Sequence, residues 1–116
     1  MIHILIPVHN RLGHTKKIIK CFREQDTSEN IRLIVINDGS TDGSKEWLYK
    51  QKDIITIDGN GNLLWGGAVE LGLKYIFKDY KIKDAILLIN NDVLIEKNYL
   101  KNILKTFKKN KTAAVG

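Results

Sequence analysis

The chain has 116 residues, of which 43% are hydrophobic and 28% are charged, and this balance is typical of one globular domain and excludes a disordered segment. The formal net charge is +6, but basic and aromatic residues do not interleave as in nucleic-acid-binding modules, so we expect no nucleic-acid partner. The single cysteine, Cys21, excludes a disulfide within the chain. No apolar run reaches the roughly 18 residues of a membrane span. We therefore expect a cytoplasmic protein.

The first half of the chain predicts two buried strands, each followed by a helix. Residues 2–6 are a β-branched run, which predicts a strand, and residues 12–25 place apolar side chains at helical spacing. A second apolar run covers residues 31–36. The loop at residues 39–43 then offers Ser, Thr or Asp as the cap of a helix that contains Trp47.

The second half repeats the pattern. Residues 54–57 predict a third strand, and the turn-forming residues 58–62 separate it from a helix over residues 66–78. A fourth strand is predicted over residues 85–89. The last helix, over residues 97–109, has apolar residues at i, i+3, i+4 and i+7.

This alternation predicts an α/β fold of the Rossmann-like kind, with a mainly parallel sheet and helices on both faces. The strands are continuously apolar, as strands covered on both faces should be. We expect residues 1–116 to form a single domain. Residues 112–116 are typical of the start of a fifth strand, so we also expect the sequence to be truncated.

Polar, turn-forming residues follow every predicted strand. In an open parallel sheet, ligands bind beyond the carboxyl ends of the strands, near the point where the strand order reverses. We therefore expect one ligand site to be built from these four segments, which are residues 7–11, 37–40, 58–62 and 90–92.

Each of these segments has a functional and a structural interpretation. Asp38 could accept hydrogen bonds from a base N–H or a ribose hydroxyl, or could form an Asx turn or a helix cap. Asn90-Asn91-Asp92 suits a hard divalent cation that takes other ligands from phosphate, or could be a turn. The glycines from Gly59 to Gly72 could present backbone N–H groups to a phosphate or sugar, or could be structural. Their spacing matches neither a Walker loop nor a dinucleotide fingerprint.

Other residues also leave alternatives open. His9 and Arg11 could contact a nucleotide, and Trp65 could stack on a base or sugar or belong to the core or an interface. For Cys21 and Trp47 we favour core positions, and we favour a surface position for His14. The late lysines favour a solvated helix face over attraction to phosphates or anionic lipid; they are Lys97, Lys101, Lys105, Lys108, Lys109 and Lys111.

Three segments together resemble the inverting family 2 glycosyltransferases with the GT-A fold. They are Ile6-Pro7-Val8-His9-Asn10-Arg11, Val35-Ile36-Asn37-Asp38-Gly39-Ser40-Thr41-Asp42-Gly43-Ser44 and Leu88-Ile89-Asn90-Asn91-Asp92-Val93. Their order and spacing also agree with the family, and the resemblance covers only the N-terminal part of a typical member. Residues 62–72 resemble the Gly- and Asn-rich stretch of rhamnosyltransferase-like members.

The resemblance implies a site for a nucleotide-diphospho-sugar. Asp38 would hold the base or ribose, and Asp92 would be the main protein ligand to Mg²⁺ or Mn²⁺. The other residues that we expect to contact the nucleotide are Pro7, Val8, His9, Asn10, Arg11, Gly66 and Asn91.

The sequence also departs from the family. His9 stands where Tyr is common, the metal motif has one carboxylate and not two, and Val69 or Glu70 stands near where the subgroup often has Asn. The family's catalytic base lies in a later part of the domain, so we expect it beyond Gly116 and name no catalytic residue.

The resemblance implies transfer of a sugar from a UDP- or dTDP-sugar to a hydroxyl acceptor, in glycan or cell-surface polysaccharide synthesis. The acceptor would be a glycan or a lipid-linked molecule. Peripheral association with the inner face of a membrane and oligomer formation stay open. The alternative is a non-catalytic nucleotide-binding fragment or interaction module. A sugar-nucleotide nucleotidyltransferase is disfavoured, because residues 7–11 are not the Gly-rich basic loop that such enzymes place after the first strand.

Overall fold

The computed structural model describes residues 1–110, and side chains as far as Thr106, so the predicted fifth strand lies outside the described residues. Strands and helices alternate as predicted, and each begins and ends within a few residues of its expected bounds. In chain order they are β1 (Ile2–Val8), α1 (Leu12–Arg23), β2 (Ile31–Asn37), α2 (Ser44–Tyr49), β3 (Ile54–Asp58), α3 (Leu64–Phe77), β4 (Ala85–Leu88) and α4 (Tyr99–Asn110).

The four strands form one parallel sheet in the order β3-β2-β1-β4. Ile2 at the start of β1 pairs with Ile31 of β2 on one side and with Ala85 of β4 on the other. The chain moves outward from β1 to β2 to β3 and then returns to the other side of β1. The strand order therefore reverses between β1 and β4, and parallel sheets of this kind bind ligands at the carboxyl ends of the strands beside such a point.

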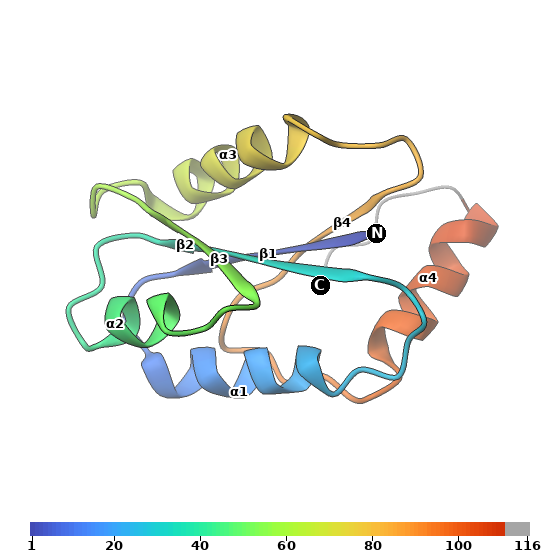
Figure 1. Ribbon diagram of the computed structural model, residues 1–116, viewed down its shortest axis with the longest axis horizontal. Coiled ribbons are helices and arrows are strands. Elements are labelled where there is room, and N and C mark those ends of the chain that lie inside the picture. The colour runs from blue at the N-terminus through green and yellow to red at the C-terminus, as the bar shows by residue number, and fades with distance from the viewer. Residues whose placement is uncertain (111–116) are drawn as a thin grey trace.

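Helices cover both faces of the sheet, which confirms the predicted layering (Figure 1). On one face α3 packs on a cluster that includes Leu5, Ile34 and Ile36. On the other face a larger cluster contains Ile4 and Ile6 of β1, with side chains of α1, α2 and α4. Successive side chains of β1 thus enter opposite cores, so a continuous apolar strand is needed.

Several residues for which the sequence predicted a core or surface position can now be placed. Trp47 and Cys21 are partly buried and pack against the larger cluster, while His14 is exposed. Gly72 lies in the middle of α3 and not at its start, and it faces the side chain of Leu5. Among the described residues, no helix combines the length and the apolarity needed to cross a bilayer.

Candidate functional site

A pocket of about 420 Å³ opens at the edge of the sheet where the strands end. Six of the predicted site residues line it, and these are Pro7, Val8, His9, Arg11, Asp38 and Asn91. Asn10, Gly66 and Asp92 are not among the lining residues. A groove of about 470 Å³ beside α4 is larger, but residues between 94 and 106 line it and no strand end reaches it. The first pocket is therefore the candidate site.

The turn after β1 brings Arg11 to the pocket. Asn10 and Arg11 both have left-handed backbones, with φ of 59° and 57°, which is uncommon for residues other than glycine. The Asn10 Oδ1 accepts a hydrogen bond from the Thr41 N–H at 2.7 Å, while its Nδ2 lies 3.5 Å from Nε2 of the lining residue His9. The Asn10 N–H donates to Ser40 Oγ at 2.8 Å. Asn10 thus ties the loop after β1 to the loop after β2.

Asp42 fixes the same turn from the other side. Its Oδ2 accepts from the Leu12 N–H at 2.9 Å, and its Oδ1 accepts from both the N–H and the hydroxyl of Ser44. One carboxylate therefore satisfies free N–H groups at the starts of α1 and α2. The Ser44 hydroxyl bond, followed by the backbone N–H bonds, lowers the pKa of Asp42. Within the described residues, the Arg11 guanidinium has no acidic partner within 4 Å, so it stays free for a ligand.

His9 is exposed in the pocket and held by the backbone of the next strand. Its Nδ1 lies 2.6 Å from the carbonyl oxygen of Asp38. A carbonyl oxygen only accepts hydrogen bonds, so Nδ1 is the protonated nitrogen in this arrangement. In this tautomer Nε2 is the acceptor nitrogen, and Asn10 Nδ2 lies 3.5 Å from it. A ligand N–H or O–H group that hydrogen-bonded to Nε2 would replace this long contact.

Asp38 supports the pocket wall from within. The residue is only 7% exposed. Its Oδ1 accepts from the Gly61 N–H at 2.7 Å and its Oδ2 accepts from the Leu63 N–H at 3.0 Å. Both carboxylate oxygens are thus engaged by the loop after β3. These long-range bonds are neither a local Asx turn nor a cap of α2, and the contact of Asp38 with a base or ribose stays a prediction.

Glycine is required where these two loops meet. A Cβ on Gly39 would lie 2.6 Å from the Gly61 Cα, and both glycines have positive φ. A Cβ on Gly59 would meet the side chains of Leu63 and Asp38 at 2.4 and 2.7 Å. The glycines after β2 and β3 therefore allow the backbones to approach closely enough for the Asp38 bonds.

The three residues after β4 have different partners. Asn90 Oδ1 accepts from the Trp65 indole N–H at 3.0 Å, which joins this loop to the start of α3. Asn91 Nδ2 donates to Oγ1 of the fully buried Thr15 at 3.1 Å, which joins it to α1. Asp92 is exposed, and its side chain has no hydrogen bond or ion pair with the rest of the described chain. The two amides thus anchor the loop and leave one carboxylate free.

The side-chain oxygens of Asn91 and Asp92 suit a cation that takes only some of its ligands from the protein. Among the described residues, no three His, Cys, Asp or Glu side chains gather as a metal cluster would require. One carboxylate beside an amide is enough for Mg²⁺ or Mn²⁺ when phosphate and water supply the remaining ligands. The residues therefore suit a cation that arrives with a phosphorylated ligand.

The remaining lining residues were missed by the sequence reasoning, or left undecided. Leu64, Ala68 and Gly61 line the pocket with Trp65. Leu64, the first residue of α3, is 79% exposed and has a left-handed backbone with a φ of 58°. The sequence did contain a signal for these residues. Two large apolar residues, Leu64 and Trp65, stand just before Gly66 and Gly67, which is unusual for a solvated loop.

Comparisons with known proteins bear on the family and the fold of the chain. The family model described as glycosyl transferase family 2 matches residues 3–116. The chain is 26% identical over 106 residues to poly-beta-1,6-N-acetyl-D-glucosamine synthase from two Staphylococcus aureus strains, MSSA476 and MW2. The match covers 78% of this chain and 24% of each synthase, so the chain spans about a quarter of the curated relatives' length.

The fold has a close counterpart among solved structures. The crystal structure of S. aureus TarS 1-349 matches with a TM-score of 0.76 and 17% sequence identity. The match covers 95% of this chain and 33% of that chain. The topology described above is therefore shared with a region of TarS about as long as the whole of this chain.

Proposed function

Because the chain belongs to glycosyl transferase family 2, we propose that it forms the part of a glycosyltransferase that binds a UDP- or dTDP-sugar. The sugar would pass to a hydroxyl acceptor in glycan or cell-surface polysaccharide synthesis, the acceptor being a glycan or a lipid-linked molecule. The observation that carries the proposal is the pocket at the reversal of strand order, with Arg11 in its lining and the free carboxylate of Asp92 beside Asn91. We propose a cytoplasmic location, which the free thiol of Cys21 fits.

The lining residues suggest how a donor would lie. Pro7, Val8 and His9 offer an apolar floor and one hydrogen-bond acceptor, which suits the nucleoside. Arg11, in the turn after β1, offers guanidinium donors in the same lining as Asn91, which suits the diphosphate. A Mg²⁺ or Mn²⁺ held by Asp92 would neutralise charge on the diphosphate as it leaves. We assign no catalytic base among residues 1–110.

Calorimetry of UDP and dTDP with and without Mn²⁺ tests this proposal. We expect Mn²⁺ to tighten nucleotide binding to the natural chain, and Asp92→Asn to remove most of that gain, a loss of about tenfold or more. Asp26→Asn is the matched control, because it removes a carboxylate that is also exposed and is not part of the pocket lining. Metal-dependent binding that is undiminished in Asp92→Asn would remove Asp92 from this role.

The alternative is a nucleotide-binding module that does not catalyse transfer by itself. It is favoured by one fact, that the chain spans about a quarter of its curated relatives. Assays of donor hydrolysis and sugar transfer, on this chain and on any longer product of the same reading frame, separate the two. We expect this chain to bind nucleotide weakly and to transfer little, and robust turnover by the 116 residues would contradict that expectation.

A further inference from the structure

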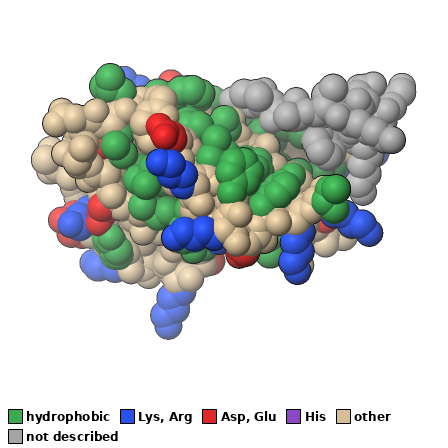
Figure 2. Space-filling view, turned by 90° about the horizontal axis from the view of Figure 1, so that it is seen from above, with side chains coloured by type: hydrophobic (Ala, Val, Ile, Leu, Met, Phe, Trp, Pro, Cys, Tyr) green, Lys and Arg blue, Asp and Glu red, His purple; other side chains and the backbone are tan. Residues whose placement is uncertain are grey.

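Exposed apolar side chains alternate with lysines in residues 77–83, which run from the last residue of α3 toward β4. Phe77, Tyr80 and Ile82 are 58%, 40% and 94% exposed. Lys78, Lys81 and Lys83 are exposed between them. We call this segment the basic–apolar loop. Hydrophobic side chains beside lysines and arginines are also seen on the molecular face that α3 covers (Figure 2).

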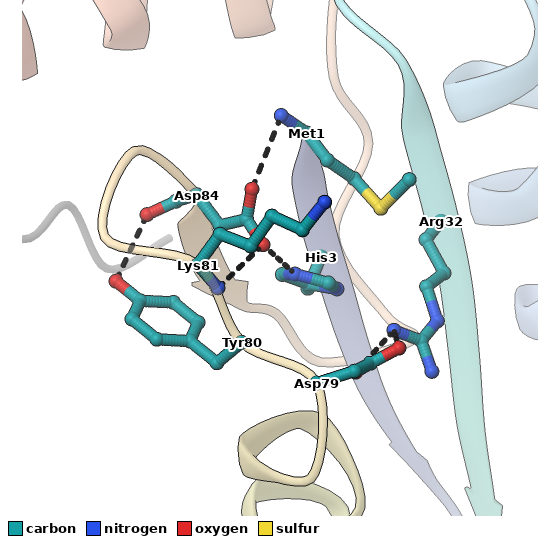
Figure 3. A network of polar contacts seen from close by, with 7 residues as sticks. All are labelled: Met1, His3, Arg32, Asp79, Tyr80, Lys81 and Asp84. Carbon is teal, nitrogen blue, oxygen red and sulfur yellow. Dashed lines mark hydrogen bonds and ion pairs between the residues drawn. The ribbon is translucent and has the colours of Figure 1, made fainter.

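The two acidic residues of this region each have a basic partner. The Asp79 side chain is 65% exposed, and it pairs with the guanidinium of Arg32 at 3.1 Å. Asp84, which follows the loop, is bound by His3 Nε2 at 2.9 Å and by the Lys81 N–H at 3.1 Å. Figure 3 shows both carboxylates directed at these partners. The lysines of the loop have no carboxylate within 4 Å among the described residues, so its outward charge is positive.

Internal contacts hold the loop in shape. The Tyr80 hydroxyl donates to the Asp84 carbonyl at 2.9 Å, and the Tyr80 and Phe77 rings meet edge to face at 5.7 Å. The Lys81 N–H bond to Asp84 closes the turn between them. Ile82, which is 94% exposed, therefore lies in a turn that these contacts support.

We propose that the basic–apolar loop binds the surface of a bilayer that contains anionic lipid. Apolar side chains beside lysines suit the boundary between headgroups and acyl chains, where the lysine amines meet lipid phosphates. The net charge of +6 favours the same partner. A protein partner is a poorer match, because a stable interface buries about 800 Å² on each side and three side chains on a protruding turn supply less.

The fold gives such binding a definite orientation. Ala85 at the start of β4 pairs with Ile2 at the start of β1, so the loop lies at the edge of the sheet where strands begin. The pocket lies at the opposite edge, where strands end. A chain bound through this loop would hold its pocket open to the solution from which a soluble donor arrives.

Flotation with lipid vesicles tests the proposal without reference to nucleotide binding. The 116-residue chain is mixed with vesicles of phosphatidylcholine containing about one third phosphatidylglycerol, and with phosphatidylcholine alone. We expect binding to the anionic vesicles only, and weaker binding as salt is raised. Ile82→Ser should weaken it about tenfold, since the loss of one inserted aliphatic side chain is large at a lipid boundary.

A pair of charge variants locates the surface. Lys81→Gln with Lys83→Gln should weaken binding roughly 25-fold, or about fivefold for each charge. Lys16→Gln with Lys17→Gln makes the same charge change on α1 near the opposite edge, and it should weaken binding less than about threefold. All of these side chains are exposed, and Lys16 has one contact with the Trp47 ring at 5.7 Å, so circular dichroism should stay unchanged and the unfolding midpoint should shift little.

Three outcomes would overturn the proposal. The first is no binding to anionic vesicles, or equal binding to neutral ones. The second is an equal loss of vesicle binding in the two double lysine variants, which would show that the attraction is spread over the whole surface and not located in the loop. The third is a dimer on gel filtration that Ile82→Ser dissociates, because the loop would then be a contact between two copies of the chain.

Discussion

Asp38 stabilises the pocket through two backbone N–H groups that lie 23 and 25 residues away in the chain. Asp38→Asn keeps the shape of the side chain but replaces one acceptor by an NH₂ group that faces an N–H. We expect it to lower the free energy of unfolding by about 2–3 kcal/mol, because a buried charge-assisted bond is lost and a donor is left unsatisfied. Urea unfolding measures the loss, and faster hydrogen exchange at Gly61 and Leu63 would locate it.

A control in the same loop keeps this prediction specific. Asn60 Oδ1 accepts a hydrogen bond from the Asn62 N–H, but at an exposed position. Asn60→Ala should therefore cost less than about 1 kcal/mol. Equal losses in the two variants would mean that the loop is sensitive to any change and that Asp38 has no special part in it.

Trp65 provides a local reporter of ligand binding, since the chain has only one other tryptophan, Trp47. Its indole is 54% exposed, lines the pocket and donates to Asn90 near the end of β4. In a Trp47→Phe background, we expect a UDP-sugar to reduce acrylamide quenching of Trp65 about twofold, because stacking on a sugar shields an aromatic ring. UDP alone should have a smaller effect. Equal quenching with and without the UDP-sugar would exclude contact between Trp65 and the donor.

At the scale of elements, α3 approaches the sheet through Gly72. A Cβ at this position would lie 2.3 Å from Cδ1 of Leu5, which is fully buried. Gly72→Ala should lower stability by about 1–2 kcal/mol, because overpacking outweighs the gain in helix propensity. Adding Leu5→Val, which removes the methyl groups in the way, should recover part of the loss. Thermal unfolding of both variants measures this coupling.

Gly66 serves as the matched control for the same helix. A Cβ there would meet nothing within 4 Å. Gly66→Ala should therefore raise stability by about 0.5–1 kcal/mol, the usual difference between the two residues inside a helix. If both alanine variants shifted stability in the same direction, packing against Leu5 would not be the cause.

The sequence was sufficient for the elements and less so for the contacts between them. The apolar runs predicted all four described strands, because a strand buried on both faces must be apolar throughout. The convergence of strand ends followed from parallel pairing. The partners of Asp38, Asn10 and Asn90 could not be predicted, because each bonds to a different loop or helix whose approach depends on glycines and positive φ angles.

At the scale of the whole molecule, carboxylates join segments that are distant in the chain. Asp42 joins the starts of α1 and α2, Asp53 pairs with Arg23, and Asp84 joins β1 to the turn before β4. The Ser44 hydroxyl bond, the Arg23 bond and the His3 bond respectively lower the pKa of these three groups. For Asp84 the value falls from 3.8 to about 2.

These lowered pKa values determine how the stability of the fold changes as the pH falls. A carboxylate whose pKa is lower in the folded state stabilises the fold above its unfolded value of 3.8, and that contribution is lost as pH falls toward the folded value. We therefore expect the unfolding midpoint to be level from neutral pH to about pH 5 and to fall steadily between about pH 4 and pH 2. Asp84→Asn should be less stable than the natural chain at pH 7 and should lose less on acidification, since its share of the linkage is already gone. Asp26→Asn, whose carboxylate has no hydrogen-bond partner among the described side chains, should follow the natural profile. An Asp84→Asn profile parallel to the natural one at every pH would show that the pair with His3 contributes nothing to the acid transition.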